Sequence, residues 1–381
     1  GKYQFENTPD LRDIFTMGKL LQMMGVDVVR EGTTLHLNTF RVNKFEAPYE
    51  QVKKMRASIY VLGPLIARYG HAKVSLPGGC AWGPRPVNLH IEGVRKLGAS
   101  IDIEQGYIIA KAKRLKAAKI AFDVASVGAT GNVMMAAVLA RGTTLIKNAA
   151  MEPEITALAQ FLMKMGARID GIGTHQLEIE GVDALTPVDD VMIPDRIEAA
   201  TFAIAAAMTE GEVTIHGAKP EHLNAVIDKL REAGVKIERR GAAMIAKRGP
   251  RLTPVDVTTL PYAGFPTDVQ AQMMALMALT PGISIITERI FESRFGHVAE
   301  LGRLGADIAI EGPSAIVKGG KRLSGAPVMA SDLRASAALV LAGLAAKGST
   351  QVNRIYHLDR GYEKIDAKLK QLGGRISRIQ E

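Results

Sequence analysis

The chain has 381 residues, a single cysteine, a formal net charge of +9 and only 5% aromatic residues. This length predicts about two domains with aliphatic cores, and a single cysteine excludes an internal disulfide, so we expect a reducing, cytoplasmic location. The longest apolar run, residues 335–346, is too short to span a bilayer, and the first residues are not typical of a signal peptide.

The positive charge indicates an anionic partner, although solvated surface lysines such as those in residues 111–119 explain part of it equally well. Nucleic acid is disfavoured because the basic residues are scattered and lack interleaved aromatic side chains. We therefore expect small-molecule partners, no nucleic acid, no membrane and a monomeric chain. Clusters with metal-ligand spacing, phosphate loops and dinucleotide fingerprints are missing from the sequence, so we expect neither metal nor cofactor.

Taken in order, the chain repeats one unit of roughly 70 residues. Glycine is the usual left-handed stop after a helix, so a recurrent glycine between a helical run and an extended segment predicts a helix-to-strand joint. One series of such joints falls at Gly25, Gly98, Gly166, Gly234, Gly305 and Gly373. A second series, after apolar stretches, falls at Gly1, Gly70, Gly142, Gly211, Gly282 and Gly348.

Each unit is predicted to run strand, helix, strand, helix and then two strands. The first helix of a unit is apolar on nearly all sides, which is typical of a buried helix, whereas the second has a charged face, as in residues 225–233. The apolar runs are residues 133–140, 202–208, 271–279 and 335–346. This pattern predicts an α/β fold of two inside-out barrel domains, residues 1–194 and 195–381, each with three units around buried central helices.

The first unit begins at its middle, because Gly1 takes the position of a joint. We therefore expect that its opening strand and buried helix are missing. On this interpretation the chain is less stable and less active than a longer one that contains them.

Polar residues stand at the predicted starts of the buried helices. Serine, threonine and aspartate there are candidate helix caps, and an arginine there opposes the helix dipole unless an anion is bound beside it. The candidate caps are Ser126, Asp195, Thr267 and Ser331, and the arginines are Arg56, Arg196 and Arg334.

The acidic residues allow more than one interpretation. Asp268 serves either as a reactive group or only as a favourable charge at a helix start. Asp332 and Arg334 pair with each other in the simplest structural interpretation, and Asp359 caps the helix that follows it.

The stretch Leu76–His90, with the sequence LPGGCAWGPRPVNLH, places the only cysteine, Cys80, in a loop rich in glycine and proline. Arg85 follows shortly after, and arginine binds phosphate and carboxylate groups with two parallel hydrogen bonds. A thiol near a guanidinium is a candidate acid or nucleophile, and an incidental surface cysteine is the alternative.

Eight ordered motifs from about Asn7 onward resemble the enolpyruvyl transferase family, and within it the enzymes that act on UDP-N-acetylglucosamine. The motifs are the cysteine loop, Lys54-Met-Arg-Ala-Ser, Ser126-Val-Gly-Ala-Thr, Pro194-Asp-Arg-Ile-Glu, Phe265-Pro-Thr-Asp, Ile290-Phe-Glu-Ser-Arg-Phe, Asp332-Leu-Arg-Ala-Ser and Asp359-Arg-Gly-Tyr-Glu. The fold of that family, two inside-out α/β barrels, agrees with the repeats. The resemblance implies transfer of enolpyruvyl from phosphoenolpyruvate to the sugar 3-hydroxyl with release of phosphate, without a cofactor, at an early step of peptidoglycan synthesis.

The resemblance also implies roles for single residues. Cys80 would protonate the methylene carbon of phosphoenolpyruvate and be the target of fosfomycin, and Asp268 would take the proton of the sugar hydroxyl. Asp332 and Arg334 would line the reaction centre. The phosphoenolpyruvate phosphate and carboxylate would be held by Arg56, Arg85 and Arg360. The uridine and diphosphate would contact Arg85, Pro86, Val87, Asn88, Leu89, Val124, Ala125, Ser126, Val127 and Gly128, with Ile290 against the sugar nucleotide.

Four features depart from the family pattern. The family's Gly-Ala-Lys-Asn segment, which supplies a lysine and an asparagine, is not present. Asn88 stands where the family usually has aspartate, Val124 where many members have lysine, and Trp82 adds bulk to the cysteine loop. The missing segment and Val124 favour the first alternative function, a UDP-sugar-binding regulator without catalysis, whereas the presence of Cys80, Asp268, Arg56 and Arg360 argues against it. The second alternative is the relative that uses shikimate 3-phosphate, which lacks the cysteine loop.

Overall fold

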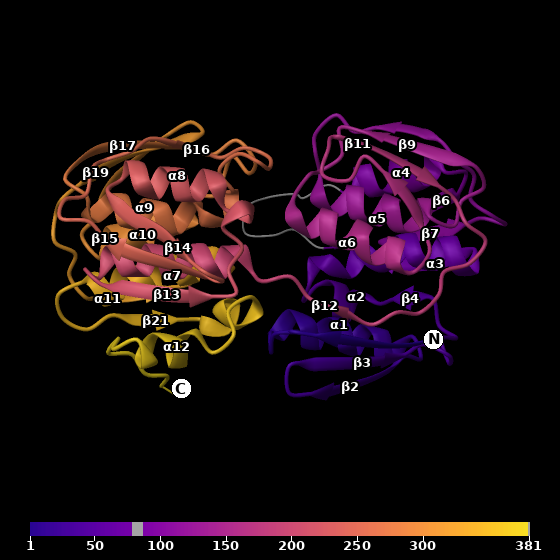
Figure 1. Ribbon diagram of the computed structural model, residues 1–381, viewed down its shortest axis with the longest axis horizontal. Coiled ribbons are helices and arrows are strands. Elements are labelled where there is room, and N and C mark those ends of the chain that lie inside the picture. Colours follow the sequence, from indigo (N-terminus) through magenta and orange to yellow (C-terminus); the bar gives the residue numbers. More distant parts are fainter. Residues whose placement is uncertain (78–86, 380–381) are drawn as a thin grey trace. The chain divides into compact units, whose positions relative to one another are not determined.

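The computed structural model describes residues 1–77 and 87–379, which divide into two compact units within residues 1–193 and 194–379 (Figure 1). Each unit has its own apolar core. Among the described residues, no helix combines the length and apolar character needed to cross a membrane.

The described part of the N-terminal unit contains three four-stranded sheets that repeat one topology. In each sheet the first two strands pair in parallel and the others are antiparallel. The first sheet has the order β12(Asp190–Val191), β1(Lys2–Glu6), β3(Thr34–Asn38), β2(Asp27–Glu31). The second has the order β4(Glu46–Ala47), β5(His71–Ser75), β7(Tyr107–Lys111), β6(Ser100–Glu104). The third has the order β8(Lys119–Ala121), β9(Thr143–Lys147), β11(Gln176–Glu180), β10(Arg168–Asp170).

The helices of this unit are of the two predicted kinds. The buried ones are the continuous pair η1(Arg56–Val61) and α3(Leu62–Tyr69), and α5(Val127–Ala137). The amphipathic ones are α1(Arg12–Met23), α4(Asn88–Lys96) and α6(Pro153–Lys164), and a short helix, α2(Tyr49–Val52), precedes η1. Buried helices with apolar residues on every side lie between sheets, which is the arrangement that the repeats predicted.

The described part of the C-terminal unit repeats the same plan. Its buried helices are α7(Arg196–Met208), α9(Gln270–Leu279) and α11(Leu333–Ala345), and its amphipathic helices are α8(Asn224–Glu232), α10(Gly296–Arg303) and α12(Ile365–Gln371). One sheet has the order β13(Glu212–His216), β15(Ala243–Arg248), β14(Val235–Arg240). The others are β16(Val257–Thr258), β17(Gly282–Thr287), β19(Ser314–Gly319), β18(Asp307–Glu311), and the pair β20(Pro327–Met329), β21(Gln351–Asn353). Short 3-10 helices are η2(Pro220–His222), η3(Thr267–Val269) and η4(Ile355–Arg360).

A left-handed glycine ends a helix at all six positions of the first series, where φ lies between 89° and 105°. A strand follows at the first five of them, but no strand follows Gly373 among the described residues. In the second series the joints are confirmed at Gly70, Gly142, Gly282 and Gly348, whereas the left-handed residue before Gly211 is Glu210, with φ of 57°, and Gly1 stays a prediction. In the first sheet, the position beside β1 that corresponds to β4 and β8 in the other two sheets is taken by β12, whose Val191 pairs with Glu6.

Candidate active site

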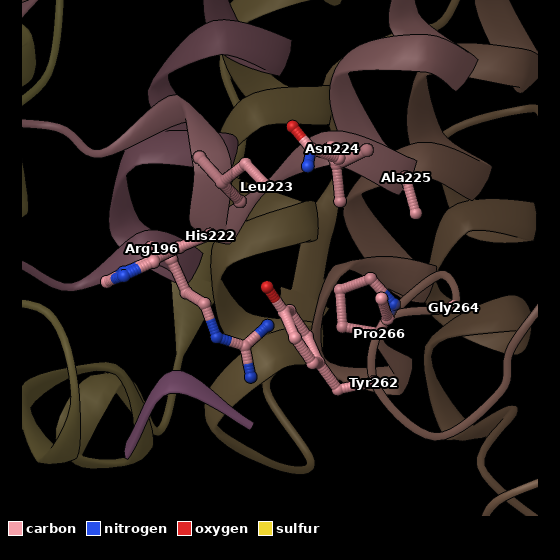
Figure 2. Close-up of a pocket in the computed structure, with 10 residues that line it drawn as sticks. Arg196, His222, Leu223, Asn224, Ala225, Tyr262, Gly264 and Pro266 are labelled. Atoms are coloured by element: carbon pink, nitrogen blue, oxygen red, sulfur yellow. The ribbon is translucent and has the colours of Figure 1, made fainter. Parts of the chain in front are cut away.

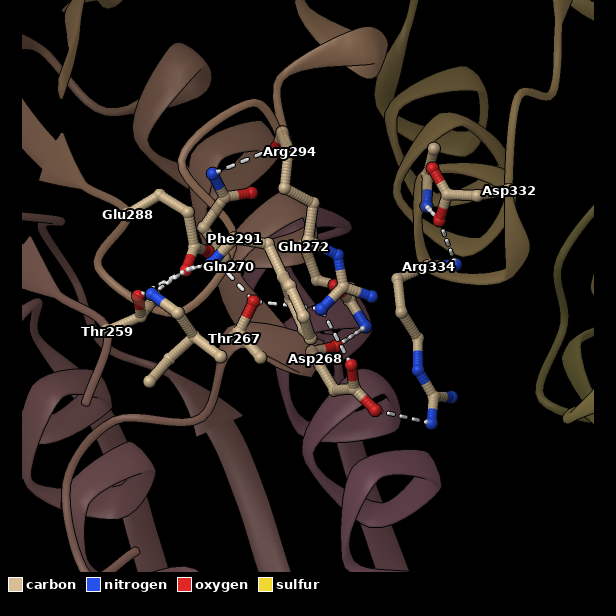
Figure 3. Close-up of polar contacts among 12 residues, drawn as sticks. Thr259, Thr267, Asp268, Gln270, Gln272, Glu288, Phe291, Arg294, Asp332 and Arg334 are labelled. Carbon is tan, nitrogen blue, oxygen red and sulfur yellow. Dashed lines mark hydrogen bonds and ion pairs between the residues drawn. The ribbon is translucent and has the colours of Figure 1, made fainter. Parts of the chain in front are cut away.

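The carboxylate of Asp268 lies between two arginines in the C-terminal unit (Figure 3). Its Oδ1 is 2.7 Å from Nη1 of Arg294, and its Oδ2 is 3.1 Å from Nη2 of Arg334. The side chain of Asp268 is 39% exposed, whereas those of Arg294 and Arg334 are only 7% and 11% exposed. Three elements therefore meet at one acid: η3, the segment before α10 and the first turn of α11.

Electrostatics keep this acid ionised. Desolvation by the surrounding side chains opposes ionisation, but the positive charges and hydrogen bonds of Arg334 and Arg294 outweigh it and hold the pKa of Asp268 far below 3.8. A carboxylate in this state can accept a proton but does not donate one. Because both arginines stabilise the ionised form, the basicity of Asp268 depends on how closely their guanidinium groups approach its carboxylate.

Asp332 caps α11 and does not pair with the side chain of Arg334. Its Oδ1 accepts hydrogen bonds from the backbone N–H groups of Arg334 at 2.8 Å and Ala335 at 3.0 Å. The predicted cap at Ser331 is therefore wrong, and so is the simple Asp332–Arg334 pair. Asp332 thus stabilises the backbone at the helix start, while the guanidinium of Arg334 contacts Asp268.

Arg334 retains hydrogen-bonding capacity at the site. Its buried Nε and Nη1 atoms have no hydrogen-bond partner among the described residues, and its guanidinium lies 5.3 Å from the ring centroid of Tyr362. A buried cation whose N–H donors have no hydrogen-bond partner lowers the stability of the fold. An anionic substrate group is the kind of partner that these donors fit.

Two further predictions about helix starts are corrected here. Thr267 does not cap a helix, because Pro266 takes the cap position and the Thr267 hydroxyl donates to Glu288. Asp359 lies inside η4 and forms an ion pair with Arg378, and α12 instead begins after Lys364. In contrast, the caps at Ser126 and Asp195 are confirmed, the latter by hydrogen bonds from the backbone of Ile197 and Glu198.

Arg360 is the last residue of η4, and the following turn is anchored by Tyr362. The Tyr362 side chain is 1% exposed, and its hydroxyl lies 3.0 Å from Oγ1 of Thr201 and 3.2 Å from Nε2 of Gln272. Gln272 also donates to the backbone carbonyl of Asp268 at 3.0 Å. The segment that carries Arg360 is thereby tied to α7, α9 and the Asp268 turn.

The expected sugar-nucleotide contact, Ile290, follows β17 and is half-buried. Its backbone N–H donates to Oε1 of Glu288 at 2.8 Å. Glu288 and Arg294 are functional candidates that the sequence reasoning missed. The only sequence signal was the position of Arg294 inside the Ile290-Phe-Glu-Ser-Arg-Phe motif.

In the N-terminal unit the expected binding residues lie at three helix starts. Arg56 begins η1, and Val87, Asn88 and Leu89 begin α4. Val124 and Ala125 precede Ser126, whose side chain caps α5, and Val127 and Gly128 form its first turn. Cys80, Trp82, Arg85 and Pro86 lie outside the described residues.

Buried contacts connect these helix starts. The hydroxyl of Tyr60 donates to the carbonyl of Val127 at 3.2 Å, and a Cβ on Gly128 would lie 3.0 Å from Nε2 of His90. The fully buried Asn132 accepts from the Gly63 N–H at 2.6 Å, and its Nδ2 lies 2.9 Å from Nδ1 of His90. His90 therefore accepts at Nδ1 and presents an Nε2–H toward the start of α5.

Burial and, second, the charge of Arg56 lower the pKa of His90 to about 4. Because an unfolded histidine has a pKa of 6.5, protons favour the unfolded chain as the pH falls from 6.5 to 4. We expect His90→Gln to reduce the loss of unfolding free energy between pH 7 and pH 4 by roughly 3 kcal/mol. Urea unfolding at both pH values measures this, and equal losses in the two proteins would show that His90 is not the acid-sensitive group.

The third arginine at a helix start, Arg196, lies over an aromatic ring (Figure 2). Its guanidinium carbon is 5.8 Å from the ring centroid of Tyr262, and both residues line a pocket of about 10 Å³. That volume is close to the minimum for one water molecule. The cation–π contact accounts for the position of Arg196 without a bound anion, so the site is assigned to Asp268 and its neighbours.

Comparisons with known proteins agree on one family of enzymes. Residues 1–369 match the family model for EPSP synthase (3-phosphoshikimate 1-carboxyvinyltransferase). A protein of Geobacter metallireducens named UDP-N-acetylglucosamine 1-carboxyvinyltransferase is 56% identical over all of this chain and 91% of its own length. A protein of Myxococcus xanthus with the same name is 54% identical over 99% of this chain and 91% of its own length.

Solved structures agree at the level of fold. The enolpyruvyl transferase NikO from Streptomyces tendae superposes with a TM-score of 0.90 at 26% identity, over 99% of this chain and 90% of its own. An EPSP synthase from Acinetobacter baumannii gives a TM-score of 0.75 at 18% identity, over 99% of this chain and 92% of its own, which supports the fold alone. The chain therefore belongs to the enolpyruvyl transferase family.

Proposed function

We propose that this enzyme transfers the enolpyruvyl group of phosphoenolpyruvate to the 3-hydroxyl of UDP-N-acetylglucosamine and releases phosphate. The observation that carries the proposal is the ionised Asp268 carboxylate between Arg294 and Arg334, of which Arg334 keeps buried donors for an anion. Relatives 54–56% identical over nearly the whole chain carry the name of this activity. We further propose a monomeric, cytoplasmic enzyme of peptidoglycan synthesis.

The reaction needs an acid, a base and fixed positive charge. Asp268 takes the proton of the sugar hydroxyl while the oxygen of that hydroxyl bonds to the central carbon of phosphoenolpyruvate. Cys80 gives a proton to the methylene carbon. The tetrahedral intermediate then loses phosphate, and its methyl group returns a proton to the deprotonated Cys80, which forms the enolpyruvyl ether. Arg334, Asp332, Arg360, Arg56 and Arg85 line the reaction centre, where the arginines stabilise the phosphate and carboxylate charges throughout.

The nucleotide is assigned to the helix starts of the N-terminal unit. Exposed backbone N–H groups and the dipole at the start of α5 favour the diphosphate, with Ser126 and Gly128 in the first turn. Arg85–Leu89 and Val124–Val127 hold the uridine and diphosphate, and Ile290 lies against the sugar. Val124 has no charge to offer the diphosphate, so the backbone N–H groups at the start of α5 supply this contact.

Phosphate release from phosphoenolpyruvate tests the proposal directly. We expect release that requires UDP-N-acetylglucosamine and is not supported by shikimate 3-phosphate. Binding of the nucleotide sugar without any release would instead establish the non-catalytic regulator. Release with shikimate 3-phosphate alone would establish the other enolpyruvyl transferase activity. Relatives named for the UDP-sugar reaction favour the first outcome.

We predict that Cys80→Ser abolishes inactivation by fosfomycin, because a serine hydroxyl is a far weaker nucleophile than a thiolate. Because Cys80 is also the proposed acid, the variant has too little activity for an inactivation assay, and mass spectrometry of the incubated proteins measures the effect. One adduct is expected on the unmodified enzyme and none on the variant. Equal labelling of both proteins would show that fosfomycin acts elsewhere.

A further inference from the structure

Glu288 is a fully buried acid that accepts four hydrogen bonds immediately after β17 (Figure 3). Its Oε1 accepts from the hydroxyl of Thr259 at 2.6 Å and from the backbone N–H groups of Ile290 at 2.8 Å and Phe291 at 3.0 Å. Its Oε2 accepts from the hydroxyl of Thr267 at 2.8 Å. Burying a carboxylate costs free energy unless its oxygens accept hydrogen bonds, and each of these four partners is a donor, so the group has a fixed orientation.

These bonds impose a direction on the neighbouring groups. Thr267 has one hydroxyl proton, which it donates to Glu288, so its oxygen accepts the 2.8 Å hydrogen bond from Nη1 of Arg294. The same Nη1 lies 2.7 Å from Oδ1 of Asp268. One continuous chain of hydrogen bonds therefore runs from Glu288 through Thr267 and Arg294 to Asp268, and we call it the Glu288 chain.

The rest of the surroundings supports this arrangement. The backbone carbonyl of Arg294 lies 3.4 Å from Nε2 of the buried Gln270, which holds the residue from its other side. Arg294 contacts Asp268 directly and reaches Glu288 through one hydroxyl, so two acids share its positive charge. Without Glu288, the Thr267 hydroxyl that accepts from Arg294 would lose the group that fixes its orientation.

We propose that Glu288 is a positioning residue for the reaction: through Thr267 it fixes Arg294, and through Arg294 the direction and basicity of the Asp268 carboxylate. The inference rests on the proposed function, in which Asp268 is the base. Glu288 itself touches no substrate in this scheme. Misplacing a base by about 1 Å is enough to lower a rate on the order of a hundredfold.

Four variants test the Glu288 chain. Glu288→Gln keeps the shape of the acid but not its charge, and Thr267→Val removes the hydroxyl. We expect each to lower kcat on the order of a hundredfold with little change in the KM of either substrate. The double variant should lower kcat no further than either single variant, because both substitutions interrupt the same chain. Thr267→Ser, which keeps the hydroxyl, should retain activity.

Thr259→Val is the matched control. It also removes a hydrogen bond to Glu288 and should lower the melting temperature, but Thr259 is not part of the chain to Arg294, so kcat should stay within about threefold. If Thr259→Val and Thr267→Val lower kcat equally, or if the effects of Thr267→Val and Glu288→Gln multiply, the positioning role is wrong and Glu288 is only structural.

Crystal structures of the variants decide the same question without turnover. We expect Arg294 to leave Oδ1 of Asp268 in Thr267→Val and to remain there in Thr259→Val. An unchanged Arg294–Asp268 contact in Thr267→Val would overturn the inference even if the enzyme is active. If the unmodified protein shows no phosphate release, the proposed function fails while these structures still decide the role of Glu288.

Discussion

Asp268→Asn is expected to lower kcat by about a thousandfold while the KM of both substrates changes little. A positioned general base contributes about 10²- to 10⁴-fold to a rate, and an amide cannot accept the proton of the sugar hydroxyl. The neighbouring arginines remain, so binding of the anionic groups persists. Phosphate release at saturating substrates measures kcat, and a variant that keeps a tenth of the activity would show that Asp268 is not the base.

The same substitution should lower the free energy of unfolding. It leaves Arg294 and Arg334, with side chains 7% and 11% exposed, without the acid between them. Removing one partner of a fully buried ion pair costs about 3 kcal/mol, and because solvent reaches Asp268, which is 39% exposed, we expect a cost of about 1–2 kcal/mol here. The double variant Asp268→Asn, Arg334→Met is the control: it removes one of the uncompensated charges, so it should regain part of the stability but none of the activity.

This stability difference should depend on pH in a defined direction. The arginines hold the pKa of folded Asp268 far below the unfolded value of 3.8. The ionised acid therefore stabilises the fold above pH 3.8, and the contribution is lost as the pH falls below that value. The difference in unfolding free energy between the unmodified protein and Asp268→Asn should begin to shrink below about pH 4 and continue to shrink as the pH falls further, and a constant difference at all pH values would contradict the ion pairs.

Features that depend on neighbouring residues could be predicted from the sequence. A glycine after an apolar run ends a helix by its own backbone freedom, and an aspartate before one caps it, as at Gly166 and Asp195. The buried helices could also be predicted, since a helix with apolar residues on every side has no face suited to water. The family motifs named Asp268 and Arg334 as candidates but did not predict their mutual contact, which the structure shows.

Contacts between residues far apart in the chain could not be predicted. Thr267 was expected to cap a helix, but Glu288, 21 positions later, competes for its hydroxyl. The pairing of Glu6 with Val191 and the contact of His90 with Asn132 have no local signal either, because each needs the folded arrangement of sheets or buried helices. The role of Cys80 stays a prediction, since it lies outside the described residues.

Tyr362→Ala is expected to have the largest effect on stability in the C-terminal unit. Tyr362 contacts residues of all three buried helices there: its hydroxyl lies near Thr201 of α7 and Gln272 of α9, and its ring lies 5.3 Å from the guanidinium of Arg334 in α11. Removing a buried aromatic side chain costs about 4 kcal/mol. Activity should fall as well, because Gln272 also holds the backbone of Asp268.

Tyr362→Phe separates packing from hydrogen bonding. The ring stays beside Arg334 while the hydroxyl bonds are lost, so we expect a cost of about 1–2 kcal/mol in unfolding free energy and a loss of activity of less than about tenfold. Urea unfolding and phosphate release measure the two effects. If Tyr362→Phe loses as much unfolding free energy as Tyr362→Ala, the two hydrogen bonds of the hydroxyl, and not the ring, hold the three helices together. In that case the same two hydrogen bonds also fix the segment that carries Arg360.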